Sequence, residues 1–456
     1  MLQKPRGTRD LLPDYMAKRR TVERTLLETA KAYGFGEVCT PMFEELELFT
    51  MKSGQGVIEE IYAFKDKSGR DLALRPELTA AVIRLYCNNM TEAPKPVKVF
   101  YFGECFRYER PQAGRYREFK QFGAEIIGGE EVPTNIEMLT LAFDMLTRTG
   151  AKGLRARVGY LDILRTLFEE LGVKRDKQGP FMTLIDKSNF DGLKDLFSER
   201  GMKGPIVKTI MEIVTMRGKP DEILPKAREL LKDYQKCIQT LDKLRTIIDG
   251  VKASGITGFK DIELDLGIAR GLDYYTGLVF EVEIPDLGAE KQVCGGGAYS
   301  LTEIFGIEAT NTTGFAIGVD RLILGLDNQK AFPALEGPTI YVIPFKGTEA
   351  KAMELLRGLR SAGVNTDVDL SNRSLSKNLK YAASIKAKYA VLIGQKELDK
   401  GVVVLRDLAT GNQTEIPFKG FVETFKKIEL GAKGTVEPGA VPEDVDLEKK
   451  KSREWE

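Results

Sequence analysis

The sequence predicts an α+β protein, in which an antiparallel sheet is interrupted by helices and followed by a small α/β domain. Two strand-like runs, 97–106 and 119–127, are joined by a charged loop, which favours an antiparallel pair. Charged segments with leucines at helical spacing fill 161–254, before strand-like runs resume. After Pro338, strand and helix patterns alternate, which is typical of an α/β unit with parallel strands.

These changes of pattern divide the 456 residues into five segments. We expect a core in two parts, 1–160 and 255–330, separated by a helical insertion at 161–254. The α/β domain is expected at 338–428. The last segment, 431–456, is rich in Gly, Pro, Glu and Lys, so we expect it to be disordered.

The first part of the core begins with a helix over Pro13–Ala32, whose apolar residues recur at helical spacing and which Gly34 closes. The run Gly36–Pro41 predicts a short strand that ends at a proline. Residues 63–75 predict a hairpin that turns at 66–69. The strands at 97–106 and 119–127 follow.

The later elements are predicted by the same signals. Lys226–Ile248 is typical of a charged helix in the insertion, and strands are expected at 262–266 and Gly277–Ile284 beside the glycine cluster Gly295–Gly297. The α/β domain is expected to alternate strands at 339–344, 364–369 and 389–394 with helices at 348–362 and 375–385.

Composition excludes several classes of protein. The formal charge of +1 does not indicate a nucleic-acid partner, so any basic surface must be local. The five cysteines are scattered and never form CxxC, which argues against a disulfide framework or a zinc site. The start lacks an apolar signal segment, and no apolar run is long enough to span a bilayer. We therefore expect a soluble protein of the reducing cytoplasm, with no membrane partner.

The chain contains no histidine. This excludes a histidine general base, a Ser/His/Asp or Cys/His pair and a histidine metal site. The chemistry must rely on carboxylates, guanidinium groups, backbone and metal ions. The absence itself is open to two interpretations: chance or engineering, or selection for synthesis when histidine is scarce.

Four short segments concentrate charge and small residues. The loop between the two central strands holds Arg107, Arg110, Arg115 and Arg117, where always-charged bidentate donors could converge on polyphosphate. A solvated charged loop is the competing interpretation. The other segments are Thr313–Leu324 with Arg321, Ala269–Tyr275 with Arg270, and Leu74–Thr79, and no GxxxxGK[ST] loop accompanies them.

Together these segments resemble the class II aminoacyl-tRNA synthetases. The strand ending at Pro41 resembles motif 1, Phe106–Glu109 with its loop and next strand resembles motif 2, and Gly314–Leu324 resembles motif 3. Within that class, Arg270–Tyr275, Arg110–Arg117 and the opening Pro5–Asp10 are similar to the histidyl family. The resemblance spans roughly residues 4–427. It implies the class II antiparallel catalytic core with its insertion, then an anticodon-binding domain.

The resemblance implies a ligase that activates L-histidine with ATP and transfers it to the 3′ end of tRNA(His). Its catalytic residues would be Arg107, Arg270 and Arg321; ATP would be bound by Arg107, Glu109 and Arg321, with Mg²⁺ bridging the outer phosphates and no metal ligand assigned to the protein. Histidine would be bound by Glu77, Thr79, Gln121, Glu125, Arg270, Tyr274 and Tyr275. Gln112 and Arg115 would contact the acceptor end of the tRNA, and the motif 1 region would form a homodimer.

The residues of one strand support the placement of the amino-acid site. Gln121, Gly123 and Glu125 share one strand face by the period of two. Because polar side chains are expensive to bury without a partner, this face favours contact with a ligand over plain core. A solvated face is the alternative. One departure from the family concerns Ala298 and Ser300, which replace the Arg and Asp that many members carry after the glycines.

Two other functions compete with this interpretation. Some histidyl-synthetase-like proteins are noncatalytic regulators that bind histidine or tRNA, and these tend to lose motif arginines or the anticodon domain. This chain keeps Arg107, Arg270 and Arg321 together with the C-terminal domain. A class II synthetase for threonine, proline or glycine conflicts with Arg270–Tyr275.

Overall fold

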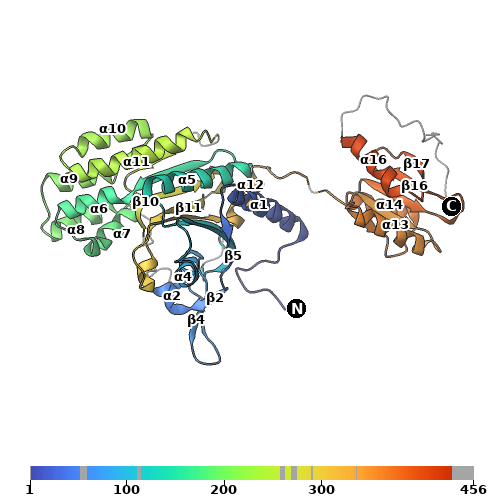
Figure 1. Ribbon diagram of the computed structural model, residues 1–456, viewed down its shortest axis with the longest axis horizontal. Coiled ribbons are helices and arrows are strands. Elements are labelled where there is room, and N and C mark those ends of the chain that lie inside the picture. Colours follow the sequence, from blue (N-terminus) through green and yellow to red (C-terminus); the bar gives the residue numbers. More distant parts are fainter. Residues whose placement is uncertain are drawn as a thin grey trace. The chain divides into compact units, whose positions relative to one another are not determined.

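The computed structural model describes residues 2–51, 59–109, 114–256, 262–268, 275–288, 291–334 and 336–433. The chain forms two compact units, 1–333 and 334–456 (Figure 1). Each unit has a sheet and hydrophobic core of its own. Among the helices of the described residues, none is both long and apolar enough to cross a membrane.

A nine-stranded sheet forms the centre of the first unit, in the order β1-β5-β6-β12-β11-β10-β7-β9-β8. Its strands are β1 (Gly36–Glu37), β5 (Val97–Phe106), β6 (Glu118–Ile127), β7 (Arg155–Tyr160), β8 (Arg217–Gly218), β9 (Ile262–Asp265), β10 (Tyr275–Glu283), β11 (Gln292–Tyr299) and β12 (Thr312–Gly318). The pairs β1/β5 and β7/β9 are parallel and the others are antiparallel. The predicted antiparallel core with inserted helices is confirmed, with parallel pairs toward its edges.

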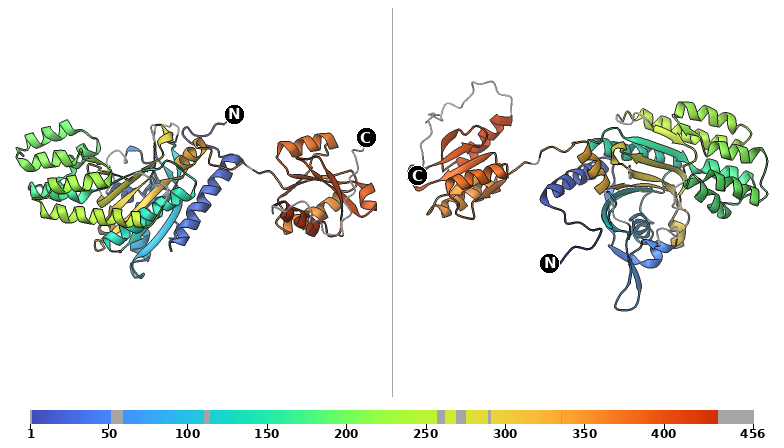
Figure 2. Two further views of the ribbon diagram at one scale, coloured as in Figure 1. Left: turned by 90° about the horizontal axis from the view of Figure 1, so that it is seen from above. Right: turned by 180° about the vertical axis from the view of Figure 1, so that it is seen from behind.

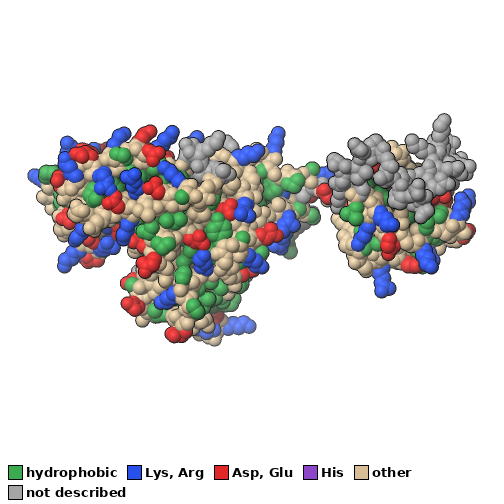
Figure 3. Space-filling view, turned by 45° about the horizontal axis from the view of Figure 1, so that its top comes forward, with side chains coloured by type: hydrophobic (Ala, Val, Ile, Leu, Met, Phe, Trp, Pro, Cys, Tyr) green, Lys and Arg blue, Asp and Glu red, His purple; other side chains and the backbone are tan. Residues whose placement is uncertain are grey.

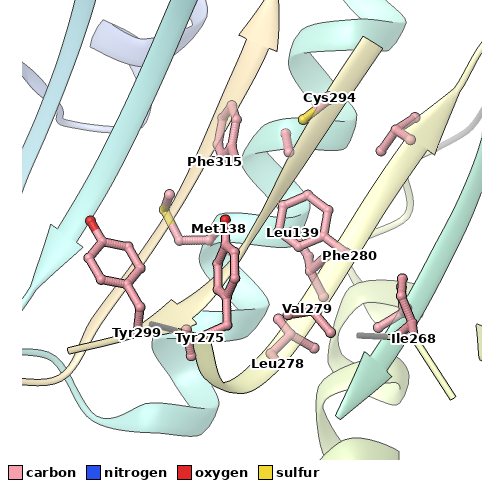
Figure 4. Packing of buried hydrophobic residues seen from close by; sticks show 14 of the residues in the cluster. Met138, Leu139, Ile268, Tyr275, Leu278, Val279, Phe280, Cys294, Tyr299 and Phe315 are labelled. Carbon is pink, nitrogen blue, oxygen red and sulfur yellow. The ribbon is translucent and has the colours of Figure 1, made fainter. Parts of the chain in front are cut away.

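One face of the central strands is covered by α5 (Glu131–Arg148). Its side chains Met138 and Leu139 are fully buried (Figure 4). Phe143 is fully buried too, and its ring meets Phe280 of β10 edge-on at 6.4 Å. The long helix α1 (Pro13–Ala32) packs on α5 and on α12 (Val319–Asn328). The opposite face of β6, β12 and β11 is therefore left for other elements.

The predicted strand at 36–41 is shorter than expected. Pairing of β1 covers Gly36 and Glu37 and continues with one bond from the Val38 N–H to the Phe100 carbonyl. The next carbonyls, of Thr40 and Pro41, accept hydrogen bonds from Nη1 of the buried Arg75 at 2.9 and 3.1 Å. Because the arginine takes these acceptors, the segment leaves the sheet.

The predicted hairpin at 63–75 forms, and belongs to a second, three-stranded sheet. That sheet has the order β2-β4-β3, from β2 (Phe43–Glu45), β3 (Ala63–Lys65) and β4 (Asp71–Leu74). Two helices lie beside it, α2 (Leu46–Thr50) and α4 (Thr79–Asn89).

The insertion is helical, and its helices gather at one end of the large sheet (Figures 1 and 2). They are α6 (Leu161–Glu170), η1 (Arg175–Lys177), α7 (Gly179–Asp186), α8 (Phe190–Glu199), α9 (Pro205–Ile213), α10 (Pro220–Leu230) and α11 (Gln235–Ala253). The single helix predicted for Lys226–Ile248 is wrong, because a turn at 231–234 separates α10 from α11. The two helices pack against each other, and the turn between them contains no glycine or proline to indicate the break.

Two short 3₁₀ helices complete the first unit, η2 (Pro285–Leu287) and η3 (Thr302–Phe305). Over the face of the molecule shown in Figure 3, basic and acidic side chains are interspersed. This agrees with the near-zero net charge of the chain.

The second unit contains a five-stranded sheet in the order β14-β13-β15-β16-β17. Its elements are β13 (Ile340–Pro344), α13 (Glu349–Ser361), β14 (Thr366–Val368), α14 (Leu375–Ser384), β15 (Tyr389–Ile393), α15 (Gln395–Asp399), β16 (Val402–Asp407), β17 (Gln413–Pro417) and α16 (Phe421–Lys433). Helices α13 and α16 share one hydrophobic cluster with the sheet, and α14 contributes to another.

The parallel strands predicted for this unit are confirmed, and beside them lies an antiparallel edge that was not predicted. Strands β14, β13 and β15 are parallel as predicted, but β16 and β17 add an antiparallel edge. The physical reason is the connections: β16 and β17 are joined by a tight turn that starts after Asp407, which leaves no room for a crossover helix. The predicted tail at 431–456 lies outside the described residues beyond Lys433.

Candidate active site

A cleft of about 440 Å³ lies on the sheet face that α5 leaves open. The strand β12 separates the two faces: Thr313 donates a hydrogen bond from Oγ1 to Asn135 of α5, whereas the next residue, Gly314, lines the cleft. The cleft brings together Glu77, Thr79, Arg107, Glu109, Arg115, Gln121, Glu125, Tyr275 and Arg321 of the predicted site residues. The other predicted residues, Gln112, Arg270 and Tyr274, lie outside the described residues.

Glu125 forms the deepest part of the cleft and is 1% exposed. Its two carboxylate oxygens accept hydrogen bonds from two hydroxyls, Tyr101 at 2.8 Å and Tyr299 at 2.7 Å. Burial raises the pKa of Glu125 to about 8, while the two tyrosine hydrogen bonds lower it. The group therefore titrates near neutral pH, and a bound cation or N–H donor would favour its ionised form.

Two glycines make room for this arrangement. Gly123 is opposite Tyr101 in the β5/β6 pairing, and Gly314 is opposite Glu125 in the β12/β6 pairing. A Cβ atom at Gly123 would collide with the Tyr101 ring, and one at Gly314 would collide with the Glu125 carboxylate. Both side chains can therefore cross the sheet face only because the opposite residue has no side chain.

A second carboxylate, Glu77, faces the same end of the cleft. It accepts hydrogen bonds from the backbone N–H of Thr79 at 2.5 Å and of Ala80 at 3.0 Å, so it caps the start of α4. Burial raises the pKa of Glu77, although those two backbone donors and the charge of Arg107 lower it. Two partly desolvated carboxylates thus share one end of the cleft.

Aromatic rings line this end. Tyr275 and Tyr299, from β10 and β11, meet edge-on with ring centres 6.3 Å apart (Figure 4). The Tyr275 ring lies over Gly297, where a Cβ atom would come within 3.0 Å of it. Of the glycine cluster, Gly295 lines the cleft, while Gly296 points to the other face, where its Cβ would meet Phe315.

Three arginines line the other end. Arg107, at the end of β5, donates from Nε to the Pro76 carbonyl at 2.8 Å, and its guanidinium carbon is 5.4 Å from the Phe119 ring centre. Arg115 forms an ion pair with Glu109, whose carboxylate is also 3.8 Å from Nη1 of Arg107.

Arg321, in the first turn of α12, closes this end. It donates from Nε to the Gly114 carbonyl at 3.0 Å and from Nη1 to the Gln292 carbonyl at 3.3 Å. These two carbonyls hold the guanidinium group at the lining of the cleft, where an anion could reach it.

The sequence did not predict several polar residues of this region. Tyr101 lies among apolar residues in the strand-like run 97–106, and Tyr299 lies two residues after the glycine cluster. Asp320 precedes Arg321 and is 6% exposed. Only the fold places these residues beside the predicted ones.

The two departures from the family motif lie in this region too. Ala298 is buried, and Ser300 Oγ is buried without a hydrogen-bond partner among the residues that the structure describes.

In the same described ranges, no group of three His, Cys, Asp or Glu side chains lies together as a metal site. The cleft is bipolar: Glu77, Glu125 and aromatic rings lie at one end, and at the other end the guanidinium groups of three arginines accompany the carboxylates of Glu109 and Asp320.

Comparison with known proteins agrees with this geometry. Residues 7–322 match the family described as histidyl-tRNA synthetase, and residues 339–428 match the anticodon binding domain. The chain is 43% identical, over 91% of its own length and 97% of the relative's, to a histidine–tRNA ligase of Archaeoglobus fulgidus.

Solved structures resemble the fold. An apo histidyl-tRNA synthetase of S. aureus is 26% identical, with a TM-score of 0.68 over 93% of this chain and 100% of that one. A histidyl-tRNA synthetase of Nostoc sp. PCC 7120 is 23% identical, with a TM-score of 0.77 over 94% of this chain and 99% of that one.

Proposed function

The chain belongs to the histidyl-tRNA synthetase family, and from that premise we infer that it activates L-histidine with ATP and joins it to tRNA(His). One observation supports the assignment of this reaction to the cleft. The bipolar cleft offers acceptors for two nitrogen donors at one end and guanidinium groups for phosphates at the other. An amino acid with a basic ring and a nucleotide need these two kinds of contact.

We assign the histidine to the carboxylate end. Glu77, with Thr79 and Gln121, would accept from the α-ammonium group, and Glu125 would accept from the imidazole N–H. Tyr275 would flank the ring, and Tyr274 and Arg270 are assigned to the same site by the family motif. Glu125 is suited to this role because it is buried, so its desolvated charge discriminates strongly between ligands that donate and those that do not.

We assign the nucleotide to the arginine end. Arg107 would hold the α-phosphate, Arg321 the γ-phosphate, and Arg270 the opposite side of the α-phosphate, with Glu109 near the adenine. Mg²⁺ enters this proposal as the companion of ATP, where it would neutralise charge on the outer phosphates.

The first reaction joins two anions. A carboxylate oxygen of histidine forms a bond to the α-phosphorus, the bond from that phosphorus to the bridging oxygen breaks, and pyrophosphate leaves. No proton has to be removed, so no general base is required. Fixed guanidinium groups supply what the step needs, which is compensation of negative charge, and a chain without histidine can do this.

The second reaction uses the tRNA. The 3′-hydroxyl of its terminal adenosine would attack the carbonyl carbon of the histidyl-adenylate, the bond from that carbon to the phosphate oxygen would break, and AMP would leave. The hydroxyl proton would pass to a phosphate oxygen of the adenylate. We propose that Gln112 and Arg115 contact the acceptor end, that the helical insertion at 161–254 grips the acceptor stem, and that residues 338–428 bind the anticodon. The match of 339–428 to the anticodon binding domain supports the last of these roles.

We also propose a cytoplasmic homodimer that forms through the motif 1 region. Met42, Phe43 and Phe64 support this, because they are large apolar side chains exposed on the small sheet. The rings of Phe43 and Phe64 meet edge-on at 6.3 Å, so they form one apolar patch. Changing Phe43→Ser should shift the protein toward monomer in analytical ultracentrifugation; an unchanged dimer would contradict the role of this patch.

The proposed function is tested by ATP–pyrophosphate exchange with each of the twenty amino acids. Exchange should depend on histidine alone. Exchange with threonine, proline or glycine would point to another class II specificity. Histidine binding without exchange would support the noncatalytic regulator instead.

The separate role of the second unit has its own test. A chain that ends before Pro338 should keep histidine-dependent exchange but lose tRNA charging, because the two reactions use different units. Unaltered charging by that shortened chain would remove the anticodon role from residues 338–428.

A further inference from the structure

The segment before α1 lies against the arginine end of the cleft, where the proposed reaction gives it no role. Arg9, from this segment, contacts a residue that lines the cleft. Its Nη2 donates to Oδ1 of Asp320 at 2.5 Å, and the two side chains are 23% and 5% exposed. Asp320 is the neighbour of Arg321 in the chain, and both residues line the cleft.

The Asp320 carboxylate is fully engaged by groups from three elements. Besides Arg9, the Tyr15 hydroxyl of α1 donates to Oδ1 at 2.6 Å, and the Lys120 backbone N–H of β6 donates to Oδ2 at 2.7 Å. Arg9 is the only one of these three donors that carries a charge. Burial lowers the pKa of the Arg9 guanidinium, but Asp320 and Tyr15 together raise it above its usual value, so Arg9 stays a cation.

The same segment also holds the loop that follows β5. The Arg9 guanidinium carbon lies 3.4 Å from the centre of the Tyr116 ring, which is close stacking. Beside it, the Arg117 backbone N–H donates to the Gly7 carbonyl at 2.9 Å. Gly7 has φ = 87°, a conformation that favours glycine.

This loop is in turn what orients Arg321. Gly114, two residues before Tyr116, supplies the carbonyl that accepts from Nε of Arg321 at 3.0 Å. Arg9 therefore contacts two neighbours of Arg321. One is the loop whose Gly114 carbonyl accepts a hydrogen bond from Arg321, and the other is the carboxylate of Asp320, the preceding residue in the chain.

We propose that Arg9 is a positioning residue for ATP, which fixes Arg321 through loop 114–117 and compensates the Asp320 charge at the phosphate end of the cleft. Without Arg9, an uncompensated carboxylate would face the site of a polyphosphate, and Tyr116 would lose its stacking partner. The Asp320 carboxylate would repel the phosphates, so ATP should bind more weakly. Because the loop would be held less firmly, Arg321 should also be less well oriented. The inference rests on the proposed function of the cleft.

The test is ATP–pyrophosphate exchange by the full chain carrying Arg9→Gln. We expect KM for ATP to rise about tenfold, as for loss of a charge-assisted contact, while KM for histidine changes less than about twofold. Arg9→Lys should recover part of the loss, since it restores the charge but not the flat group over Tyr116. Arg24→Gln is the matched control: Arg24 is exposed on α1 and should behave like the unaltered protein.

A double variant separates charge from packing. If Arg9 acts by compensating Asp320, adding Asp320→Asn to Arg9→Gln should bring KM for ATP back toward that of the unaltered protein. A KM for ATP unchanged by Arg9→Gln would overturn the proposal. So would a lower melting temperature with an equal fall of kcat and no change in KM, because that is a structural effect alone.

Failure of the proposed function can be distinguished from failure of the role proposed for Arg9. If the unaltered protein shows no histidine-dependent exchange, the proposed reaction is wrong, and the role of Arg9 fails with it. If the unaltered protein is active and Arg9→Gln matches it, only the role of Arg9 fails.

Discussion

The two ends of the cleft differ in the sign of their proposed ligand contacts and in how far their charged side chains are buried. At the carboxylate end, Glu125 is buried and both of its oxygens already have hydroxyl donors, so the site is built before any ligand arrives. At the arginine end, Arg107 and Arg115 are about a third exposed, and Arg107 and Arg321 donate hydrogen bonds to backbone carbonyls. The first end can be selective because it is desolvated, whereas Arg107 and Arg115 at the second end are partly open to solvent and so to a nucleotide.

The largest effect should come from the arginine end. Arg321→Ala should lower kcat for pyrophosphate exchange by about 10²–10³-fold, the usual loss when a fixed donor to developing charge is removed. Histidine affinity should stay within about twofold, because that end is untouched. Single-turnover kinetics and equilibrium histidine binding measure the two separately.

A graded variant sharpens this result. Arg321→Lys keeps the charge but loses the planar fork, so its rate should fall between those of Arg321→Ala and the unaltered protein. A matching loss of histidine affinity in either variant would show that the two ends are not independent.

The next effect concerns the carboxylate end. Glu125→Gln should weaken histidine binding by about 30–100-fold, because a neutral amide replaces an ionised acceptor in a buried site. ATP affinity should not change. Isothermal titration with each ligand checks this, with Glu137→Gln on α5 as the control. A fall in ATP affinity instead would mean that the two ends have been assigned the wrong way round.

The same substitution should stabilise the fold above neutral pH. Because the folded pKa of Glu125, about 8, is above its unfolded value, its contribution is complete below the unfolded pKa and is lost as pH rises through 8. Glu125→Gln removes this loss, so at pH 8.5 it should melt a few degrees higher, for about 1–2 kcal/mol.

The pH dependence distinguishes this effect from a general one. The advantage of Glu125→Gln should disappear at pH 5 in calorimetry, where the natural carboxyl is protonated and neutral. An advantage of equal size at pH 5 and 8.5 would contradict the charge argument. The expected result, an advantage at pH 8.5 alone, would mean that the protein keeps Glu125 for function at the expense of stability.

The contrast between the two ends also explains what the sequence could and could not predict. Local patterns predicted the strands and the hairpin, because alternation and turn residues act within a few positions. The motif resemblance predicted Arg107, Arg321 and Glu125, which the fold brings to one cleft. Tyr101 and Arg9 could not be predicted, since their partners Glu125 and Asp320 are 24 and 311 positions away.

Two features that the sequence did not predict have the same origin. The break between α10 and α11 was missed because the turn at 231–234 contains no glycine or proline. The antiparallel edge of the second unit was missed because the tight turn after Asp407, which joins β16 and β17, was not recognised. In both places, the tertiary arrangement decided between structures that the local pattern allowed.

The smallest effect should come from one hydroxyl at the carboxylate end. Tyr299→Phe removes the donor at 2.7 Å from Glu125 and leaves the ring in contact with Tyr275. Histidine affinity at pH 7 should fall about fivefold, for about 1 kcal/mol. Because the lost hydrogen bond lowers the pKa of Glu125, that pKa should rise further, so part of the affinity should return at pH 8.5.

A tyrosine of the other unit provides the matched control for that measurement. Tyr341 donates a buried hydrogen bond to Asn378 at 3.1 Å in the second unit, so Tyr341→Phe makes the same chemical change away from the cleft. It should leave histidine affinity unchanged at both pH values. An equal loss for Tyr299→Phe at pH 7 and 8.5 would mean that the hydroxyl acts on shape rather than on the charge of Glu125, and the preformed carboxylate end would then owe its selectivity to packing.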